Sequence, residues 1–363
     1  MTLASGQGAP LTNCHIHTFT VDHVPHRFAG ILGQLMRIRP LRLLVLALMR
    51  AIGRAPRSRL ARYAQILEVS HNRTQQDIFM IARGFYPQGT RFVVLPMDMA
   101  YMGAGEVKKS LDEQHDELRV LRDCNPGLVI PFAAVDPRRP NVVAKTIALL
   151  EEQGFGGIKL YPPLGYHPND PVLRELYAYA ARHEIPVLAH CTRRGVRYRG
   201  KPTPSMLADS AVGDDEAIER LADPDNYLPI LREHPKLKLC LAHFGGDAEW
   251  QKYLNEPWRS GASGPSTTSK SWLAKIADMI KSGAYENLYT DISYTVFADE
   301  EYVHLLKVLL SDERLQRRVL FGSDFYVVEN AKLEERRISV RIRSVLGEDL
   351  FDAIARRNPA TFL

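Results

Sequence analysis

The chain of 363 residues lacks several features that would place it in a specialised class of protein. It has only four cysteines, far apart and with no C-x-x-C pair, so we expect no disulfide framework and a reducing, cytoplasmic setting. No cationic start followed by an apolar run is present, so no secretory signal is expected. The net charge is only +5, and the basic clusters do not form the basic stripe with interleaved aromatic residues that is typical of nucleic-acid binders, so we expect no nucleic-acid binding.

A membrane-spanning run is also missing. The most apolar region, Ile31–Gly53, contains a proline and four arginines, and its longest uncharged run is Leu43–Met49. A span needs about 20 apolar residues. We interpret the region as one or two amphipathic helices that pack against the main body or against a second subunit, which leaves a homodimer open. Contact with an anionic membrane surface is the less favoured alternative.

Short apolar or β-branched runs are present throughout, and helix-like segments separate most of them. Alternation of strand and helix indicates a parallel sheet, and eight such units in this length predict a (β/α)₈ TIM barrel. The expected strands cover residues 11–17, 91–99, 128–137, 154–163, 185–191, 237–246, 287–294 and 319–326. The alternative, a doubly wound open sheet, lacks a glycine-rich phosphate fingerprint after the first strand.

The first two expected strands lie about 73 residues apart, far more than one crossover helix needs. We therefore expect a single barrel domain over residues 1–363, with a helical insertion over Arg27–Gln88. The insertion leaves the C-terminal end of the first strand, on the face where barrel enzymes carry their active site. It would serve as a lid or as an oligomer contact.

Six polar side chains stand near the C-terminal ends of five expected strands. Residues i and i+2 of a strand point the same way, so His15 and His17 can both face the barrel interior. The fourth, fifth, sixth and eighth strands end near Lys159, His190, His243 and Asp324. Burying such groups without partners would cost several kcal/mol. A divalent cation is a suitable partner, with zinc favoured and manganese or iron as alternatives.

The pattern resembles the amidohydrolase superfamily, and most closely its amidohydrolase-related branch, which includes aminocarboxymuconate-semialdehyde decarboxylase. The resemblance is carried by NCHIHTF, GIKLYPP, DPDNYLPILREHPKLKLCLAHFGG, YTDIS and FGSD, and it extends nearly from end to end. It implies a metal-dependent TIM barrel. It fails over Arg27–Gln88, so it says little about how substrate enters.

The resemblance also implies roles for the six residues. In a single-metal site the ligands would be His15, His17, His190 and Asp324, with His243 as general base or water-orienting group. In the two-metal version a carboxylated Lys159 bridges the ions, and His190 and His243 bind the second one. Asp324 would contact both metal and water and act as general base. The alternative for Lys159 is an unmodified lysine that binds a substrate carboxylate.

These observations predict a hydrolase that uses a metal-activated water to attack a small amide, ester or lactone, one that carries a carboxylate. The alternative is a non-oxidative decarboxylase of an aromatic or dienoic acid at the same site. A barrel used only as a binding scaffold would not need the ligands. Arg193 and Arg194, in the loop after His190, are candidates for gripping the carboxylate, and Tyr161 and Tyr166 for lining the pocket. Asp291, in TDIS, could support a metal ligand or make hydrogen bonds at the strand end, and we favour the strand-end role.

Overall fold

The protein is seen here in a computed structural model, which describes residues 9–28, 73–204, 213–255, 270–299, 301–325 and 335–363. It also describes the isolated positions 38, 40, 41, 43, 44, 47, 69 and 206. Most of the apolar segment Ile31–Gly53, and with it most of the predicted insertion, therefore lies outside the described residues. The insertion remains a prediction, apart from the helix α4 (Gln75–Arg83) that its C-terminal part contains.

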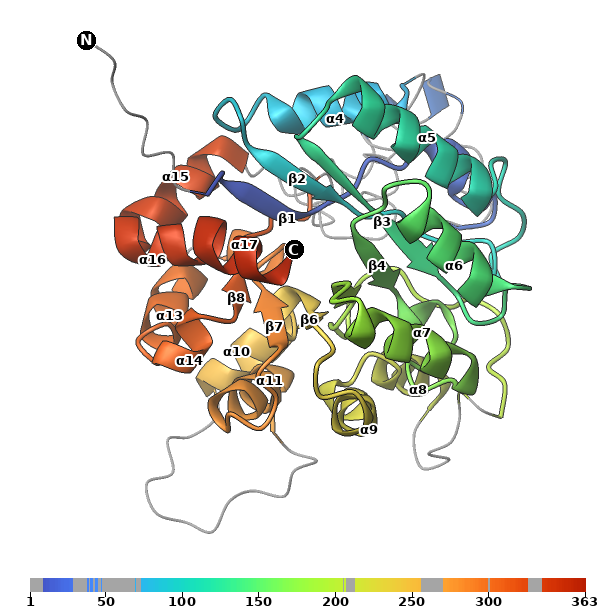
Figure 1. Ribbon diagram of the computed structural model, residues 1–363. Helices are drawn as coiled ribbons and strands as arrows, with labels where there is room; N and C mark the ends of the chain where they lie inside the picture. The colour runs from blue at the N-terminus through green and yellow to red at the C-terminus, as the bar shows by residue number, and fades with distance from the viewer. Residues whose placement is uncertain are drawn as a thin grey trace.

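Eight parallel strands form one sheet in the order of the sequence, and their helices surround it (Figure 1). The strands are β1 (Thr12–Ile16), β2 (Arg91–Val94), β3 (Val129–Val135), β4 (Gly157–Leu160), β5 (Val187–Ala189), β6 (Leu239–Leu241), β7 (Leu288–Asp291) and β8 (Val319–Leu320). Each strand lies inside its expected run, which confirms the predicted barrel. The first and last strands meet through a parallel bridge between Ile16 and Phe325, and Cys14 N donates to Phe321 O at 2.8 Å.

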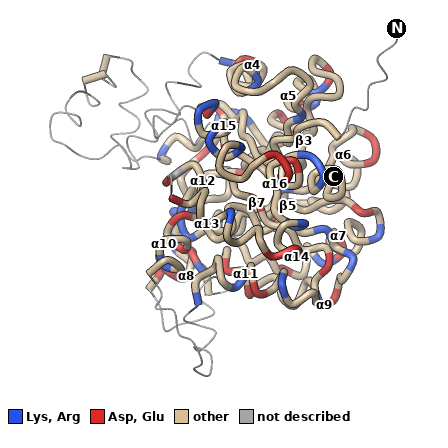
Figure 2. Tube along the Cα trace, turned by 90° about the vertical axis from the view of Figure 1, so that its left-hand side faces the viewer, with Lys and Arg blue, Asp and Glu red and all other residues tan. Residues whose placement is uncertain are grey.

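The helices follow the strands in the alternation that the sequence predicts. They are α4, α5 (Leu111–Cys124), α6 (Val142–Glu151), α7 (Pro171–Arg182), α8 (Asp214–Arg220), α9 (Leu228–Glu233), α10 (Asp247–Asn255), α11 (Trp272–Lys281), α12 (Thr295–Ala298), α13 (Glu301–Leu309), α14 (Glu313–Gln316), α15 (Glu335–Leu346), α16 (Glu348–Asp352) and α17 (Asn358–Phe362). Helix α5 shows why such segments fold: a Ser110–Glu113 capping box starts it, and Leu118 and Leu121 on one face are buried. Figure 2 shows Lys and Arg interspersed with Asp and Glu over the described helices.

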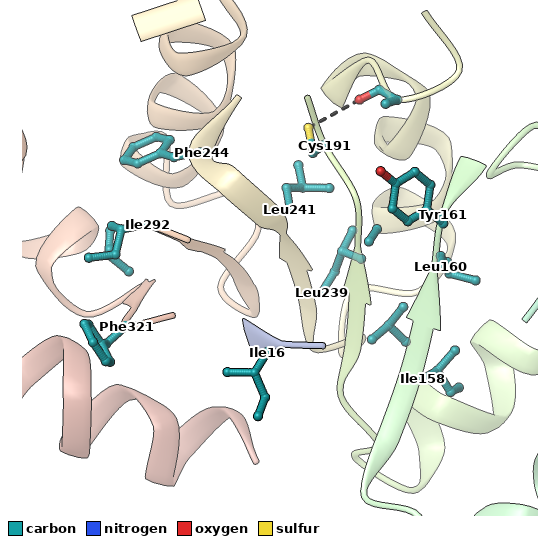
Figure 3. Packing of buried hydrophobic residues seen from close by; sticks show 14 of the residues in the cluster. Ile16, Ile158, Leu160, Tyr161, Cys191, Leu239, Leu241, Phe244, Ile292 and Phe321 are labelled. Carbon is teal, nitrogen blue, oxygen red and sulfur yellow. Dashed lines mark hydrogen bonds between the residues drawn. The ribbon is translucent and has the colours of Figure 1, made fainter. Parts of the chain in front are cut away.

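Apolar side chains pack in two layers, one inside the barrel and one between the sheet and the helices. Ile16, Leu160 and Leu241 belong to the outer layer (Figure 3). Strict alternation would turn Cys14 outward with Ile16, but Cys14 belongs to the inner cluster, because the β1–β2 ladder shifts register between Asn13 and Ile16. All four cysteines are free, and all but Cys124 are buried, as expected of thiols in apolar strands. Among the described residues, no helix is both long and apolar enough to cross a membrane.

Candidate metal centre

His15, in the first strand, and His17, directly after it, are buried and turn the same nitrogen toward Asp324. His15 Nδ1 lies 2.9 Å from Asp291 Oδ2, and His17 Nδ1 lies 2.7 Å from the carbonyl oxygen of Leu95. Both partners can only accept, so each ring carries its proton on Nδ1, and each Nε2 offers a lone pair. This is the arrangement of metal-binding imidazoles, which donate their other nitrogen to a carboxylate or a carbonyl.

Asp324 follows the eighth strand and faces both lone pairs. Its Oδ1 lies 3.2 Å from His17 Nε2 and 3.6 Å from His15 Nε2. Its backbone is left-handed, with φ of 63°, and its amide donates to the carbonyl oxygen of His15 at 2.8 Å. Since both rings carry their protons on Nδ1, neither Nε2 donates to this oxygen. An ionised oxygen and two imidazole lone pairs therefore converge without a proton between them.

His190 and His243 form a second pair with the same property. His190 Nε2 lies 3.1 Å from the carbonyl oxygen of Arg194, which fixes the proton on Nε2. His243 Nδ1 lies 3.1 Å from the carbonyl oxygen of Ser293, which fixes its proton on Nδ1. The remaining nitrogens, His190 Nδ1 and His243 Nε2, are 3.1 Å apart. Two lone pairs thus face each other, an arrangement that a cation between or beside them would stabilise.

His243 is held in an unusual backbone conformation at the end of the sixth strand. Its φ is 67°, in the left-handed region that side chains rarely adopt. Its amide donates to Asp291 Oδ1 at 2.9 Å, and its carbonyl accepts from Thr295 Oγ1 at 2.7 Å. Hydrogen bonds on both sides of the residue offset the strain, and such strain is typical of functional sites.

Lys159 completes the group that the sequence predicted. It lies on β4, is 1% exposed, and its Nζ has no hydrogen-bond partner among the described residues. The ammonium lies 5.7 Å from the centre of the Tyr161 ring. Burial lowers its pKa from 10.5 to about 8, although the charges of Asp291 and Asp324 act in the opposite direction.

These residues fit a divalent ion. His15, His17 and Asp324 each offer one atom, and the three atoms lie within 4.8 Å of one another. All three residues are buried, and no described residue forms a hydrogen bond with His15 Nε2 or Asp324 Oδ1. Burial lowers the pKa of His15 to about 3, and burial together with neighbouring positive charge lowers the pKa of His190. Both rings are therefore neutral, as metal ligands must be. The donor set of imidazole and carboxylate is the one that zinc, manganese and iron accept.

The four residues predicted to bind substrate are engaged in contacts within the protein. Arg193 pairs with the buried Glu249 at 2.6 Å and lies over the Trp272 ring, and Arg194 pairs with Asp247 at 2.8 Å. Both arginines thus tie the loop after β5 to residues near the start of α10 and α11. Their role toward a substrate remains a prediction.

The two tyrosines lie on either side of the loop after β4. The Tyr161 ring stacks on His190 with 3.9 Å between ring centres, and its hydroxyl accepts from the amide of Val196. The Tyr166 hydroxyl accepts from the amide of Tyr161 and donates to the carbonyl oxygen of Val135. Tyr161 therefore contacts the site, and Tyr166 holds the strand ends together.

Asp291 and Ser293 also lie at the site, although sequence reasoning did not place either among the six candidate residues. Asp291 does make the strand-end hydrogen bonds expected of it, but it also contacts His15 directly. Ser293 was not singled out, although its Oγ lies 3.1 Å from His15 Nδ1 and 2.9 Å from His243 Nδ1. Their position in the sequence could have indicated this. Both lie at the end of the seventh strand, and the sixth and eighth strands on either side of it end in a candidate ligand.

A model of the amidohydrolase family matches residues 14–363 of the chain. The protein belongs to the amidohydrolase family. The match covers the barrel and all six predicted site residues, so the resemblance carried by the strand-end motifs is confirmed. No curated protein matches this amidohydrolase in sequence.

Solved structures similar to this amidohydrolase share its fold over nearly the whole chain. Dihydroxybenzoic acid decarboxylase from Polaromonas, with bound manganese and 2-nitroresorcinol, has 13% identity and a TM-score of 0.57, and the match covers 98% of this chain and 96% of that one. For manganese-bound 5-carboxyvanillate decarboxylase from Novosphingobium aromaticivorans the identity is 17%, the TM-score 0.57 and the coverage 98% and 96%. A probable 2-pyrone-4,6-dicarboxylic acid hydrolase from Acinetobacter baumannii has 12% identity and a TM-score of 0.51, and the match covers 97% of this chain and 98% of that one.

Proposed function

We propose that this amidohydrolase is a metal-dependent hydrolase of a small amide, ester or lactone that carries a carboxylate. The observation that carries the proposal is the convergence of ionised Asp324 with the Nε2 lone pairs of His15 and His17 in a buried site. A divalent ion held there, zinc or else manganese or iron, would act as a Lewis acid and make water acidic enough to ionise near neutral pH.

The protein's own residues supply the proton transfers and the orientation. His243 Nε2 carries a lone pair, and burial lowers its pKa, so the ring is a neutral base at pH 7. It is positioned by Ser293 on one side and by its contact with His190 on the other. Asp324 Oδ1 is a second acceptor for the proton of an attacking water. The proton taken up during attack would then be delivered to the leaving oxygen or nitrogen.

The Lys159 ammonium supports a carboxylate-bearing substrate, because it is a buried positive charge to which no residue in the described part of the chain is hydrogen-bonded. A carboxylate placed beside it would gain a charge-assisted hydrogen bond in a site that excludes water. Carbamate formation on the same amine is the competing use, and it would instead give the site a further ligand for a second ion.

Non-oxidative decarboxylation of an aromatic acid is the second candidate. It is favoured by the similar structures, of which two described above are a dihydroxybenzoic acid decarboxylase and a 5-carboxyvanillate decarboxylase, and one is a probable 2-pyrone-4,6-dicarboxylic acid hydrolase. In that reaction Asp324 or His243 would first accept the proton of the substrate's hydroxyl group and then deliver it to the ring carbon, whose bond to the carboxyl group breaks as carbon dioxide leaves. Both candidates use the same buried groups, so the product separates them.

The test begins with the metal. The purified full-length protein should hold one or two equivalents of transition metal, and His15→Gln should lose it while keeping the folded circular dichroism spectrum. The matched control is His183→Gln, at an exposed histidine that stacks on Tyr179 at the end of α7. A protein without metal that zinc and manganese fail to activate would overturn the proposal.

The second step is a substrate panel of carboxylate-bearing lactones, amides and esters beside hydroxylated aromatic acids. Release of a new acid, alcohol or amine without carbon dioxide supports hydrolysis. Carbon dioxide release from the aromatic acids supports the second candidate and contradicts the first.

A further inference from the structure

Asp291 occupies an unusual place among the residues around the candidate metal centre, because one buried carboxylate contacts two strands of the site at once. It ends β7 and has 0% exposed surface. Its Oδ2 accepts from His15 Nδ1 at 2.9 Å. Its Oδ1 accepts from the amides of His243 and Ser293 at 2.9 Å and 3.0 Å, and from the hydroxyl of Ser293.

All four of these groups are donors, so the position demands an acceptor on both oxygens. Two of the donors are backbone amides, which cannot give up their protons. The Ser293 hydroxyl can rotate, but its other close neighbours are His15 Nδ1 and His243 Nδ1, each of which carries a proton. The His15 ring is the remaining donor, and it can move its proton from one nitrogen to the other.

We propose that Asp291 is a positioning residue that fixes the proton of His15 on Nδ1, and so keeps the Nε2 lone pair open toward the metal site. The same carboxylate holds the left-handed backbone of His243 through its amide. Asp291 therefore couples the first-strand ligand to the residue proposed as base on the sixth strand. The inference rests on the metal centre of the proposed function, but not on which reaction occurs there.

Asp291→Asn tests this logic because an amide has nearly the shape of a carboxylate and only one accepting oxygen. With that oxygen toward the two backbone amides, the NH₂ group faces His15 Nδ1. The ring must then accept at Nδ1 and carry its proton on Nε2, which points at Asp324 Oδ1, 3.6 Å away. In the opposite orientation the NH₂ group would face the two backbone amides, which are also donors and cannot lose their protons. The first orientation is therefore favoured.

The experiment reads the tautomer directly in the metal-free, full-length protein labelled with ¹⁵N-histidine. Long-range proton–nitrogen spectra distinguish Nδ1–H from Nε2–H rings, and the His15 signals are identified by their loss in His15→Gln. We expect wild-type His15 to be the Nδ1–H form and the Asp291→Asn variant to be the Nε2–H form. Zinc affinity, measured by competition with a chelator, should fall roughly 10–100-fold in the variant.

Two controls separate this role from a general loss of packing. Asp136→Asn changes another fully buried strand-end carboxylate, which accepts from Arg138 at 2.8 Å, and should leave the His15 tautomer and zinc affinity unchanged. Ser293→Ala removes the hydroxyl beside both rings but keeps Asp291 and the Ser293 carbonyl, so both rings should keep Nδ1–H.

A wild-type His15 that carries its proton on Nε2 would overturn the proposal without any variant, so the test survives if Asp291→Asn does not fold. An Asp291→Asn protein that keeps Nδ1–H would overturn it equally. Because the spectra need neither metal nor substrate, they remain informative if the proposed hydrolase activity is never found.

Discussion

Replacing Lys159 with methionine should stabilise the metal-free protein at neutral pH. Methionine has nearly the length of the lysine stem and lacks the ammonium, which is buried and makes no hydrogen bond with the residues that the structure describes. Burial lowers the pKa of Lys159 from 10.5 to about 8. A tenfold change in acidity corresponds to about 1.4 kcal/mol, so keeping this group protonated in the folded state costs about 3 kcal/mol relative to the unfolded chain.

The sign of the pH dependence follows from the direction of that change. The folded pKa is the lower one, so the unfolded chain binds more protons between about pH 8 and pH 10.5, and stability rises with pH across that window. The cost is fully present below about pH 8. The stability advantage of Lys159→Met should therefore be about 3 kcal/mol at pH 7 and less than about 1 kcal/mol at pH 10.

Urea unfolding at the two pH values, with chelator present and carbon dioxide removed, measures both numbers. Lys275→Met is the matched control. Lys275 pairs with Asp223 and Asp225 at 2.8 Å and 2.7 Å, and its pKa is raised despite burial, so its loss should destabilise the protein. A Lys159→Met protein less stable than wild type at pH 7 would refute the reasoning, because the ammonium would then be stabilised by Asp291 and Asp324 more than burial penalises it.

The same pKa bears on the two roles proposed for Lys159. Only a neutral amine can react with carbon dioxide to form a carbamate. With a pKa of about 8, roughly a tenth of the side chain is neutral at pH 7, which is on the order of 300 times more than for an exposed lysine. Burial thus prepares the amine for carbamate formation, and it also makes the protonated form a strong partner for a substrate carboxylate.

Three further predictions follow from single contacts. Asp324→Asn should lower kcat/KM by roughly 10²–10⁴-fold, and near-normal turnover would contradict its role. The urea midpoint of the metal-free protein should stay nearly unchanged or rise, since the carboxylate is buried among lone pairs. Burial lowers the pKa of His115 to about 3, so the free energy of unfolding should fall as the pH drops below 6.5, by about 2 kcal/mol at pH 5. His115→Gln should remove this pH dependence in urea titrations. Arg193→Met should lower the free energy of unfolding by about 2–3 kcal/mol, because it leaves buried Glu249 without its charge partner. A raised KM without loss of stability would favour the substrate-binding role of Arg193 instead.

The strands and the polar residues at their ends were predictable because both signals are local. A short apolar run that ends in His190, His243 or Asp324 marks a buried strand with a polar tip, and the barrel then brings the tips together. The tautomers were not predictable, because they depend on acceptors from other strands, such as Leu95 for His17. The ion pair of Arg193 with Glu249 escaped prediction for the same reason, since its partner comes from a helix 56 residues later.

The net charge of the buried site favours an anionic substrate whether the site holds one divalent ion or two. Burial lowers the pKa of His15, His190 and His243, so these rings are neutral, while Asp291 and Asp324 are anionic. With a protonated Lys159, one divalent ion leaves a single excess positive charge. A carbamate on Lys159 adds a negative charge where a positive one stood, and two divalent ions again leave a single excess positive charge. In both versions one anionic group restores neutrality, and because charge is costly to bury unpaired, we expect a substrate carboxylate to bind more tightly than its neutral ester or amide.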